Sequence, residues 1–511
     1  MRHKPKNNAS SGCAASIYTS GCADDSVQRS QSVSWQICYW PRGLKHYEQS
    51  TTIGHCPQVK IQAGLTCFQH NRPSLTESPA VTAPIRIVRG KELAQTELKR
   101  LSQRTGNFSQ DDAQERVNSI LCAVRERGDQ AILDFTERFD GYRPEALAVP
   151  EASLEAAWTT LPQDLRDALE LAHRRITDFH QRQRPADIAV TGPHGEQLGR
   201  RWRPVARAGL YVPGGRAAYP STVLMNAVPA RVAGVKELMI CSPGRRDGTV
   251  NPAVLAAAHL AGIKTVFAIG GAQAIAAMAY GSESVPSVDV ISGPGNLYVT
   301  LAKQAVYGLV GIDSLAGPSE VLVIADHSAK TDQVAADLLA QAEHDPMAAA
   351  VLITTDPSLG DKIVDELAHQ LVNHPRREIC EASLRDWGLV VICDDLETCA
   401  LLSDSFAPEH LELLVERPEP LADRIQNAGA IFLGPWSPEA VGDYLAGPNH
   451  TLPTCGAARF SGALSQLLQL QGSPQRTGDA LPDTVQWIDP VPAQRFELPQ
   501  RVSTGKPSAP I

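Results

Sequence analysis

The sequence contains no run of about twenty apolar residues, the length needed to cross a bilayer, so no segment is expected to span a membrane. An excess of basic residues is also missing. The 47 lysines and arginines are outnumbered by 56 aspartates and glutamates, and the formal net charge is -9. This balance argues against a general nucleic-acid-binding protein and leaves small molecules as the expected partners.

Two further patterns are missing. The chain has 11 cysteines, but no pair has the spacing of a zinc ribbon. The amino terminus lacks the apolar segment of a secretory signal peptide. We therefore expect a reduced, intracellular protein.

The chain is long enough, at 511 residues, for two or more domains. Residues 1–83 are rich in Ser, Thr, Asn, Gln and Cys and have no sustained hydrophobic periodicity, so we expect them to be disordered. They are either an organelle transit peptide or an upstream stretch wrongly included in the reading frame. The expected location is cytoplasmic, or plastid if the segment is a transit peptide.

Residues 84–466 have the patterns of an α/β protein. From Ile85 to Arg182 apolar residues recur at spacings of three and four, which predicts an amino-terminal helical segment. Short apolar runs that end in Gly, Pro or Asp then alternate with amphipathic stretches, which predicts two doubly wound parallel sheets. The strand candidates are ELMICSPG, TVFAIGG, VDVISGPG, EVLVIAD, AAVLITTD, GLVVICDD, LELLVERP and AIFLGPW.

The last segment, residues 467–511, has a different character. Seven prolines interrupt it. Because proline breaks helices, no long helix can form there, and we expect an unstructured tail.

Three glycine-rich turns follow strand candidates: GLYVPGGRAAYPSTV, FAIGGAQAIAAMAYG and ISGPGNLYVT. In open α/β sheets, ligands bind at the carboxyl ends of strands, where glycine lets the backbone approach a phosphate. None of the turns is a G-x-G-x-x-G fingerprint, so plain strand-to-helix turns remain an alternative. Gln273 and Asn296 favour a ligand, since either side chain can bond a ribose or an amide.

The stretch LAQAEHDP places Gln341 and His344 three residues apart, on one face of a predicted helix. Downstream, VGDYLAGPNH offers Asp443 and His450. An imidazole, a carboxylate and an amide oxygen form a mixed ligand set that suits zinc. The alternative is a capped or solvated Gln and His pair without a metal.

In FAPEHLELLV, Glu409 and His410 are adjacent. A carboxylate next to an imidazole suits a proton-abstracting site, because the two groups together can take a proton or activate water at neutral pH. Neighbours on a regular helix point about 100° apart, so both reach one substrate only at a helix start or in a loop. The alternative is an exposed helix amino terminus at which Glu409 stabilises the helix dipole.

Eight strings occur together and in order: GLYVPGG, PSTVLMNAVPARVAGV, GGAQAIAAMAYG, GPGN, AGPSEVLVIAD, QAEH, APEHLEL and GDYLAGPNH. In these strings the sequence resembles histidinol dehydrogenase, from about Pro84 to Leu464. The resemblance implies two incomplete Rossmann-like domains and a homodimer that binds one zinc per subunit. It also implies oxidation of L-histidinol to L-histidine through L-histidinaldehyde, with two NAD⁺, at the end of histidine biosynthesis.

The resemblance further implies roles for single residues. Tyr211, Gln273 and Asn296 match positions that contact NAD. Gln341, His344 and Asp443 match zinc ligands that also meet the substrate. The remaining expected substrate contacts are Ser319, His410 and His450.

The same likeness assigns the proton chemistry. His410 would take the alcohol proton as hydride leaves, and Glu409 would activate water for the second oxidation. Zinc would hold the substrate more than act as an acid. A zinc-dependent hydrolase that uses the same His, Asp and Glu is an alternative, which the glycine turns disfavour.

The chain departs from the family at its carboxyl end. The family has a terminal helical segment whose Glu and His reach the neighbouring subunit's site, the His as a fourth zinc ligand. In this chain no histidine follows His450, and the only later glutamate is Glu497. We expect either weaker zinc binding and a weaker dimer, or an inactive chain. A shifted reading frame after Ser465 is one explanation, which the other two frames of the coding DNA would test.

Overall fold

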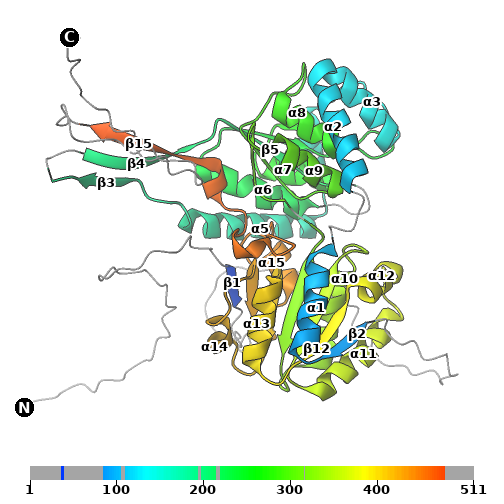
Figure 1. The fold of residues 1–511 in the computed structure, drawn as a ribbon. Coiled ribbons are helices and arrows are strands. Elements are labelled where there is room, and N and C mark those ends of the chain that lie inside the picture. Colours follow the sequence, from blue (N-terminus) through cyan, green and yellow to red (C-terminus); the bar gives the residue numbers. More distant parts are fainter. Residues whose placement is uncertain are drawn as a thin grey trace, which may run out of the picture. The chain divides into compact units, whose positions relative to one another are not determined.

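The computed structural model describes residues 36–39, 85–104, 110–193, 197–214, 219–315 and 317–477. The chain divides into two units, Met1–Ser32 and Val33–Ile511, and every described residue lies in the second. Helices and strands alternate through most of the described chain, and the strands form two parallel sheets and a small antiparallel one (Figure 1). The predicted α/β class with two doubly wound sheets is confirmed.

The larger sheet has seven parallel strands. In spatial order they are β1 (Gln36–Tyr39), β14 (Ala430–Leu433), β13 (His410–Leu414), β10 (Glu320–Ala325), β11 (Ala349–Thr354), β12 (Leu389–Ile392) and β2 (Arg86–Arg89). Every residue of β10 to β13 is buried, because helices cover both faces of the sheet. The helices on one face are α1 (Lys91–Ser102), α13 (Leu396–Phe406) and α14 (Pro418–Ala422). Those on the other are α10 (Thr331–Ala342), α11 (Pro357–Leu371) and α12 (Arg377–Trp387).

The smaller parallel sheet has five strands. Their spatial order is β7 (Thr265–Phe267), β6 (Glu237–Cys241), β5 (Arg207–Tyr211), β8 (Val290–Ser292) and β9 (Gly311–Ile312). One face packs against α4 (Glu151–Thr160), α5 (Gln163–Arg182), α6 (Pro220–Ala233) and α7 (Pro252–Leu260). The opposite face packs against α2 (Gln110–Arg127), α3 (Asp129–Asp140), α8 (Gly271–Tyr280) and α9 (Leu297–Val306).

The predicted amino-terminal helical segment is divided between the two sheets. It begins with a strand, β2, and α1 then packs on the seven-stranded sheet, whereas α2 to α5 cover the two faces of the five-stranded sheet. The strand was missed because only Val88 of its four residues is buried, which leaves no hydrophobic period to read.

Two segments expected to be without structure contribute strands. Within residues 1–83, β1 pairs with β14 through its backbone, at the edge of the seven-stranded sheet. Within residues 467–511, β15 (Leu470–Thr477) pairs antiparallel with β4 (Gln197–Pro204), which in turn pairs with β3 (Ile188–Thr191). Backbone pairing needs no hydrophobic pattern, and β15 is an edge strand, the position at which a sheet tolerates proline. The rest of both segments lies outside the described residues.

The remaining helical pieces are α15 (Glu439–Tyr444) and the 3₁₀ turns Ala457–Arg459 and Gln466–Gln469. No helix in the described ranges has both the length and the apolar character to cross a membrane.

Candidate active site

Glu409 and His410 lie at the amino end of β13, not on a helix. Helix α13 ends at Phe406, and Ala407 turns the chain out of it with a left-handed φ of 55°. The two residues are only 6% and 3% exposed. The alternative of an exposed helix amino terminus is therefore wrong, and both groups enter the protein interior.

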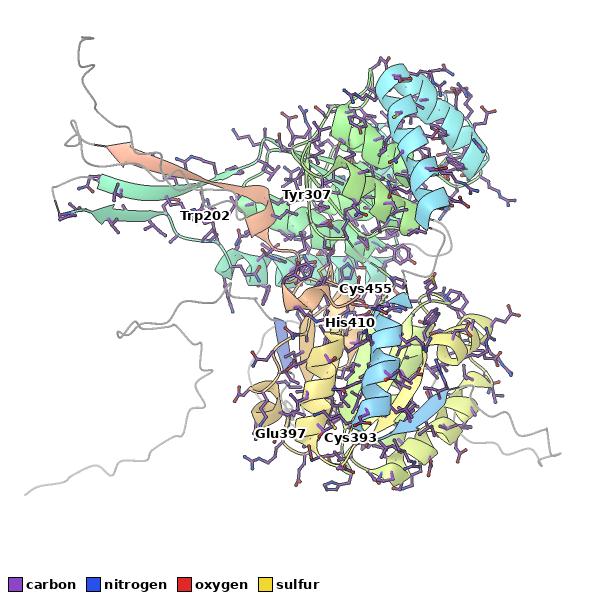
Figure 2. The ribbon with its side chains drawn as sticks, viewed as in Figure 1. Trp202, Tyr307, Cys393, Glu397, His410 and Cys455 are labelled. Atoms are coloured by element: carbon purple, nitrogen blue, oxygen red, sulfur yellow. The ribbon has the colours of Figure 1, made fainter. Side chains whose placement is uncertain are left out.

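Glu409 and His410 lie at the amino ends of the strands, whereas ligands in open α/β sheets are expected at the carboxyl ends. Because the strands are parallel, their amino ends lie at the same end of the sheet, and Glu320, the first residue of β10, lies there too. Figure 2 shows His410 at this end of the sheet and Cys393, which follows β12, at the other. The carboxyl-end rule thus does not describe this part of the site.

The main chain of Glu320 holds both members of the pair. Its N–H donates to Oε2 of Glu409 at 2.9 Å, and its carbonyl oxygen lies 3.0 Å from Nδ1 of His410. Because a carbonyl only accepts, Nδ1 carries a proton and the lone pair of the neutral ring is on Nε2. Nε2 is buried and has no hydrogen-bond partner within the described chain.

Helix α15 brings two carboxylates to the same imidazole. Oδ1 of Asp443 lies 3.6 Å from Nε2 of His410, and Oε1 of Glu439 lies 3.7 Å from Nδ1. Ligand atoms of His410, Glu439 and Asp443 all lie within 4.8 Å of one another, a spacing that could hold a metal ion. Glu439 was missed in the sequence, although its spacing of four residues from Asp443 puts both on one helix face.

The carboxylate of Glu412 positions the start of this helix. Its Oε1 accepts a hydrogen bond of 2.7 Å from the backbone N–H of Glu439, and the contact is fully buried. Glu412 belongs to β13, two residues after His410, so the strand that carries the imidazole also anchors α15.

Burial and charge shift the pKa values of the cluster in opposite directions. Burial raises the pKa of Glu409 to about 7 and that of Glu439 to about 8. Burial would lower the pKa of His410, but Glu439, Glu409 and Asp443 together raise it well above its usual value. Burial would likewise raise the pKa of Asp443, but the nearby imidazole of His410 and its charge lower it. The site therefore holds an ionised Asp443 beside groups that exchange protons near neutral pH.

Gln341 and His344 stand at the carboxyl end of α10. Gln341 is fully buried, yet neither atom of its amide has a hydrogen-bond partner among the residues described. His344 is exposed, and its Nδ1 bonds to the carbonyl oxygen of Ala340 at 2.8 Å, which leaves the lone pair of Nε2 for a ligand. A buried amide without partners is costly, so the solvated or capped pair considered above does not describe Gln341.

Asp443 links this helix end to the rest of the site. Its pKa responds to the charges of His410, His450 and His344, so these groups lie within electrostatic reach of one carboxylate. Burial lowers the pKa of His450. Ser319 immediately precedes Glu320, and its carbonyl accepts a hydrogen bond of 3.0 Å from the N–H of Ala349. His344, His450 and Asp443 thus lie near His410 at the start of β13, and Ser319 directly precedes β10.

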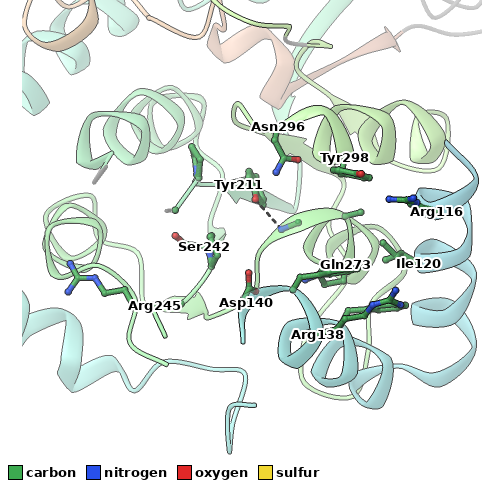
Figure 3. A pocket seen from close by; sticks show the side chains of 18 of the residues that line it. Arg116, Ile120, Arg138, Asp140, Tyr211, Ser242, Arg245, Gln273, Asn296 and Tyr298 are labelled. Carbon is green, nitrogen blue, oxygen red and sulfur yellow. Dashed lines mark hydrogen bonds between the residues drawn. The ribbon is translucent and has the colours of Figure 1, made fainter. Parts of the chain in front are cut away.

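Tyr211, Gln273 and Asn296 line one cavity of about 1250 Å³ at the carboxyl ends of β5, β7 and β8 (Figure 3). The hydroxyl of Tyr211 accepts a hydrogen bond of 3.1 Å from the N–H of Gly271. Asn296 caps α9 by accepting from the N–H of Val299 at 3.2 Å. Gln273 is 1% exposed, and no described residue bonds its Oε1. At this sheet the glycine turns do have the carboxyl-end placement expected of a ligand site.

One segment connects the residues around Asp443 with the helices of the five-stranded sheet. Asn449, next to His450, donates a hydrogen bond of 2.5 Å to the carbonyl oxygen of Met225 in α6. The carbonyl of Leu445 accepts one of 3.2 Å from Arg175 in α5. The loop that carries His450 is therefore built against helices that cover the five-stranded sheet.

A family model described as histidinol dehydrogenase matches residues 103–469. A curated histidinol dehydrogenase of Parasynechococcus marenigrum strain WH8102 is 76% identical over 391 residues, which cover 76% of this chain and 90% of that protein. The chain belongs to the histidinol dehydrogenase family. Another relative, from Prochlorococcus marinus strain MIT 9313, is 68% identical over 389 residues, or 76% of this chain and 88% of that one.

A solved structure agrees with this membership. The crystal structure of histidinol dehydrogenase from Elizabethkingia anophelis matches with a TM-score of 0.73 and 37% identity, covering 77% of this chain and 90% of that one. The resemblance seen in the sequence motifs is confirmed, and the chain is an oxidoreductase of the histidinol dehydrogenase family.

Proposed function

We propose that this chain oxidises L-histidinol to L-histidine through L-histidinaldehyde, with two NAD⁺ as hydride acceptors. The observation that carries the proposal is the contact between the Glu320 carbonyl and Nδ1 of His410. Since Nδ1 is engaged by this carbonyl, Nε2 is the ring nitrogen that exchanges a proton in this buried site, beside Asp443. A base with its proton acceptor aimed into a water-poor site is what the oxidation of an alcohol requires.

In the first step Nε2 of His410 takes the hydroxyl proton while the alcohol carbon gives a hydride to NAD⁺, which yields the aldehyde and NADH. Glu409 then removes a proton from water as the water oxygen adds to the aldehyde carbon. The anion of the hydrate would then give a second hydride, for which a second NAD⁺ would be the acceptor, and become the carboxylic acid of histidine. This acid loses its proton to solvent and becomes the carboxylate. The raised pKa of Glu409, about 7, matches a carboxyl group that accepts a proton near neutral pH.

The large cavity is the proposed NAD site. Tyr211, Gln273 and Asn296 line it, as the family resemblance requires. Helices α8 and α9 begin at Gly271 and Leu297, beside these residues, and the partial positive charge at a helix start favours phosphate.

The donor set also fits zinc. Gln341 has a buried amide oxygen without a protein partner among the residues described, His344 has its Nε2 lone pair available, and Asp443 is an ionised carboxylate. These three residues would hold the ion, and a bound zinc would fix the imidazole and amine of histidinol so that its alcohol carbon keeps one position. Ser319 and His450 would complete the substrate contacts. The family resemblance further predicts a homodimer, which light scattering of the purified chain would test.

The test is to measure NADH formed per L-histidinol consumed by the purified full chain, with added zinc. Two NADH per histidinol are expected. A zinc-dependent hydrolase would give no NADH, and an inactive family member would bind NAD⁺ without turnover. Either result would contradict the proposal.

A further inference from the structure

Asp140 has no assigned role, yet it reaches the cavity that is proposed to hold NAD. It is the last residue of α3, and Gly141 follows with a left-handed φ of 79°. Figure 3 shows its carboxylate between Ser242 and Gln273, on the wall below Tyr211. A carboxylate at this place needs a reason, because arginines outnumber the acidic lining residues, which are Asp140 and Glu115.

One oxygen of the Asp140 carboxylate, Oδ2, is buried without a hydrogen-bond partner within the described ranges. Burial raises the pKa of Asp140 to about 6, so the charge is costly to hold there without partners. A ligand that offers two hydroxyl donors would remove this cost.

The cavity also contains arginines, which separate into two groups around Asp140. Figure 3 shows Arg116 and Arg138 on the side of α2 and α3, and Arg245 on the opposite side. These cations can meet the pyrophosphate of a dinucleotide. They would also attract the 2′-phosphate of NADP, so a group that repels this phosphate is needed if the site is to bind only NAD.

Two aromatic rings, Phe135 and Phe139, line the cavity near Asp140. Phe139 lines the same cavity, is 53% exposed, and stacks on Phe135 at a ring distance of 5.8 Å. The guanidinium of Arg138 lies over the ring of Phe139 at 5.5 Å, so a base could pack against the exposed part of this ring beside that cation. Asp140 is the next residue in the chain. The ribose attached to that base would lie within reach of the carboxylate.

On the basis of the proposed NAD-dependent function, we propose that Asp140 binds the ribose diol of the adenosine half of NAD and excludes NADP. The two hydroxyls would donate to the carboxylate, whereas a 2′-phosphate would place two like charges in contact. Acidic residues in dinucleotide folds usually follow the second strand of the sheet. In this chain the residue precedes the whole sheet, since β5 begins at Arg207.

The experiment measures dissociation constants for NAD⁺ and NADP⁺ by calorimetry, and kcat/KM with each, for the full chain and its variants. The wild type should prefer NAD⁺. In Asp140→Asn the dissociation constant of NAD⁺ should rise by about tenfold or more, and its kcat/KM should fall by a similar factor. The affinity and kcat/KM for NADP⁺ should increase, so that the preference for NAD⁺ is lost. Asp140→Glu keeps the charge and should keep the preference, which separates recognition from folding.

The control is Glu137→Gln, which removes a negative charge from the same helix at a residue outside the cavity wall. It should leave the preference unchanged. If Asp140→Asn alters binding of the two dinucleotides equally, or not at all, the assignment to Asp140 is overturned while the NAD function stands. A wild type that binds neither dinucleotide would instead overturn the proposed function, and this inference with it.

Discussion

Nδ1 of His410 lies 3.0 Å from the carbonyl oxygen of Glu320, a contact that orients the imidazole from the neighbouring strand. The contact belongs to the backbone of β10, so no side chain has to be retained for it. It determines which ring nitrogen is basic, because Nδ1 must donate and Nε2 then keeps the lone pair. The chemistry of the site therefore depends on the pairing of two central strands.

Replacing His410 with Asn should remove the base but keep a donor for the Glu320 carbonyl. We expect kcat for histidinol oxidation to fall by about 100- to 10,000-fold, with NAD⁺ affinity unchanged. Steady-state kinetics and calorimetry would measure the two effects. His369→Asn, which changes a histidine whose side chain is 80% exposed, is the matched control and should have normal activity. Normal turnover by the His410 variant would exclude His410 as the base.

The pH dependence of the second oxidation should follow Glu409, whose pKa burial raises to about 7. Below this pH the carboxyl group is protonated and cannot take a proton from water, so the rate should decrease as pH falls through this value. The rate of NADH formation from histidinaldehyde, measured against pH, would show this. Glu409→Gln should be slow at every pH and should stop after one NADH per histidinol. A pH profile shared by both proteins would contradict the assignment.

Removal of zinc should abolish turnover, and restoring the ion should recover it. Gln341→Ala would lose one ligand and is expected to hold zinc about 10- to 100-fold more weakly, as measured by competition with a chromophoric chelator. Gln370→Ala changes a glutamine of α11, whose Nε2 bonds to Asp332 and Glu366, and should keep normal zinc affinity. Equal zinc affinity in the two variants would place the metal elsewhere, such as at His410, Glu439 and Asp443.

A buried ion pair lies at the amino end of β10, close to the site. Nη1 of Arg104 lies 2.7 Å from Oε1 of Glu320, and both side chains are 0% exposed. Arg104→Met would leave the carboxylate of Glu320 buried without its cation, and we expect a loss of about 3 kcal/mol or more in unfolding free energy. Urea unfolding would measure it. Arg385→Met breaks an exposed pair with Asp386, whose side chains are 59% and 49% exposed, and should cost about 1 kcal/mol or less. Similar losses in both would contradict the role of burial.

Local patterns were enough to predict much of this protein. The runs around β10, β11 and β12 are apolar at nearly every residue, which is the sequence pattern of a strand covered on both faces. Gln341 and His344 were paired by helical spacing, and the glycine turns after β5, β7 and β8 located the cavity. These features depend on neighbours within a few residues, so the sequence contains them in full.

Other features exist only once distant segments meet. Strands β1 and β15 are held by backbone pairing, which side-chain patterns do not encode. No residue near His410 in the chain indicates that the carbonyl of Glu320, 90 residues earlier, determines which nitrogen of the His410 ring carries the proton. Glu439 and Asp443 reach the imidazole of His410 because α15 packs near the amino end of β13. Asp140 reaches the cavity from α3, a helix that precedes every strand of the five-stranded sheet in the chain. The identity of each group is written in the sequence, but its charge, its proton and its partner follow from burial and from packing across the fold.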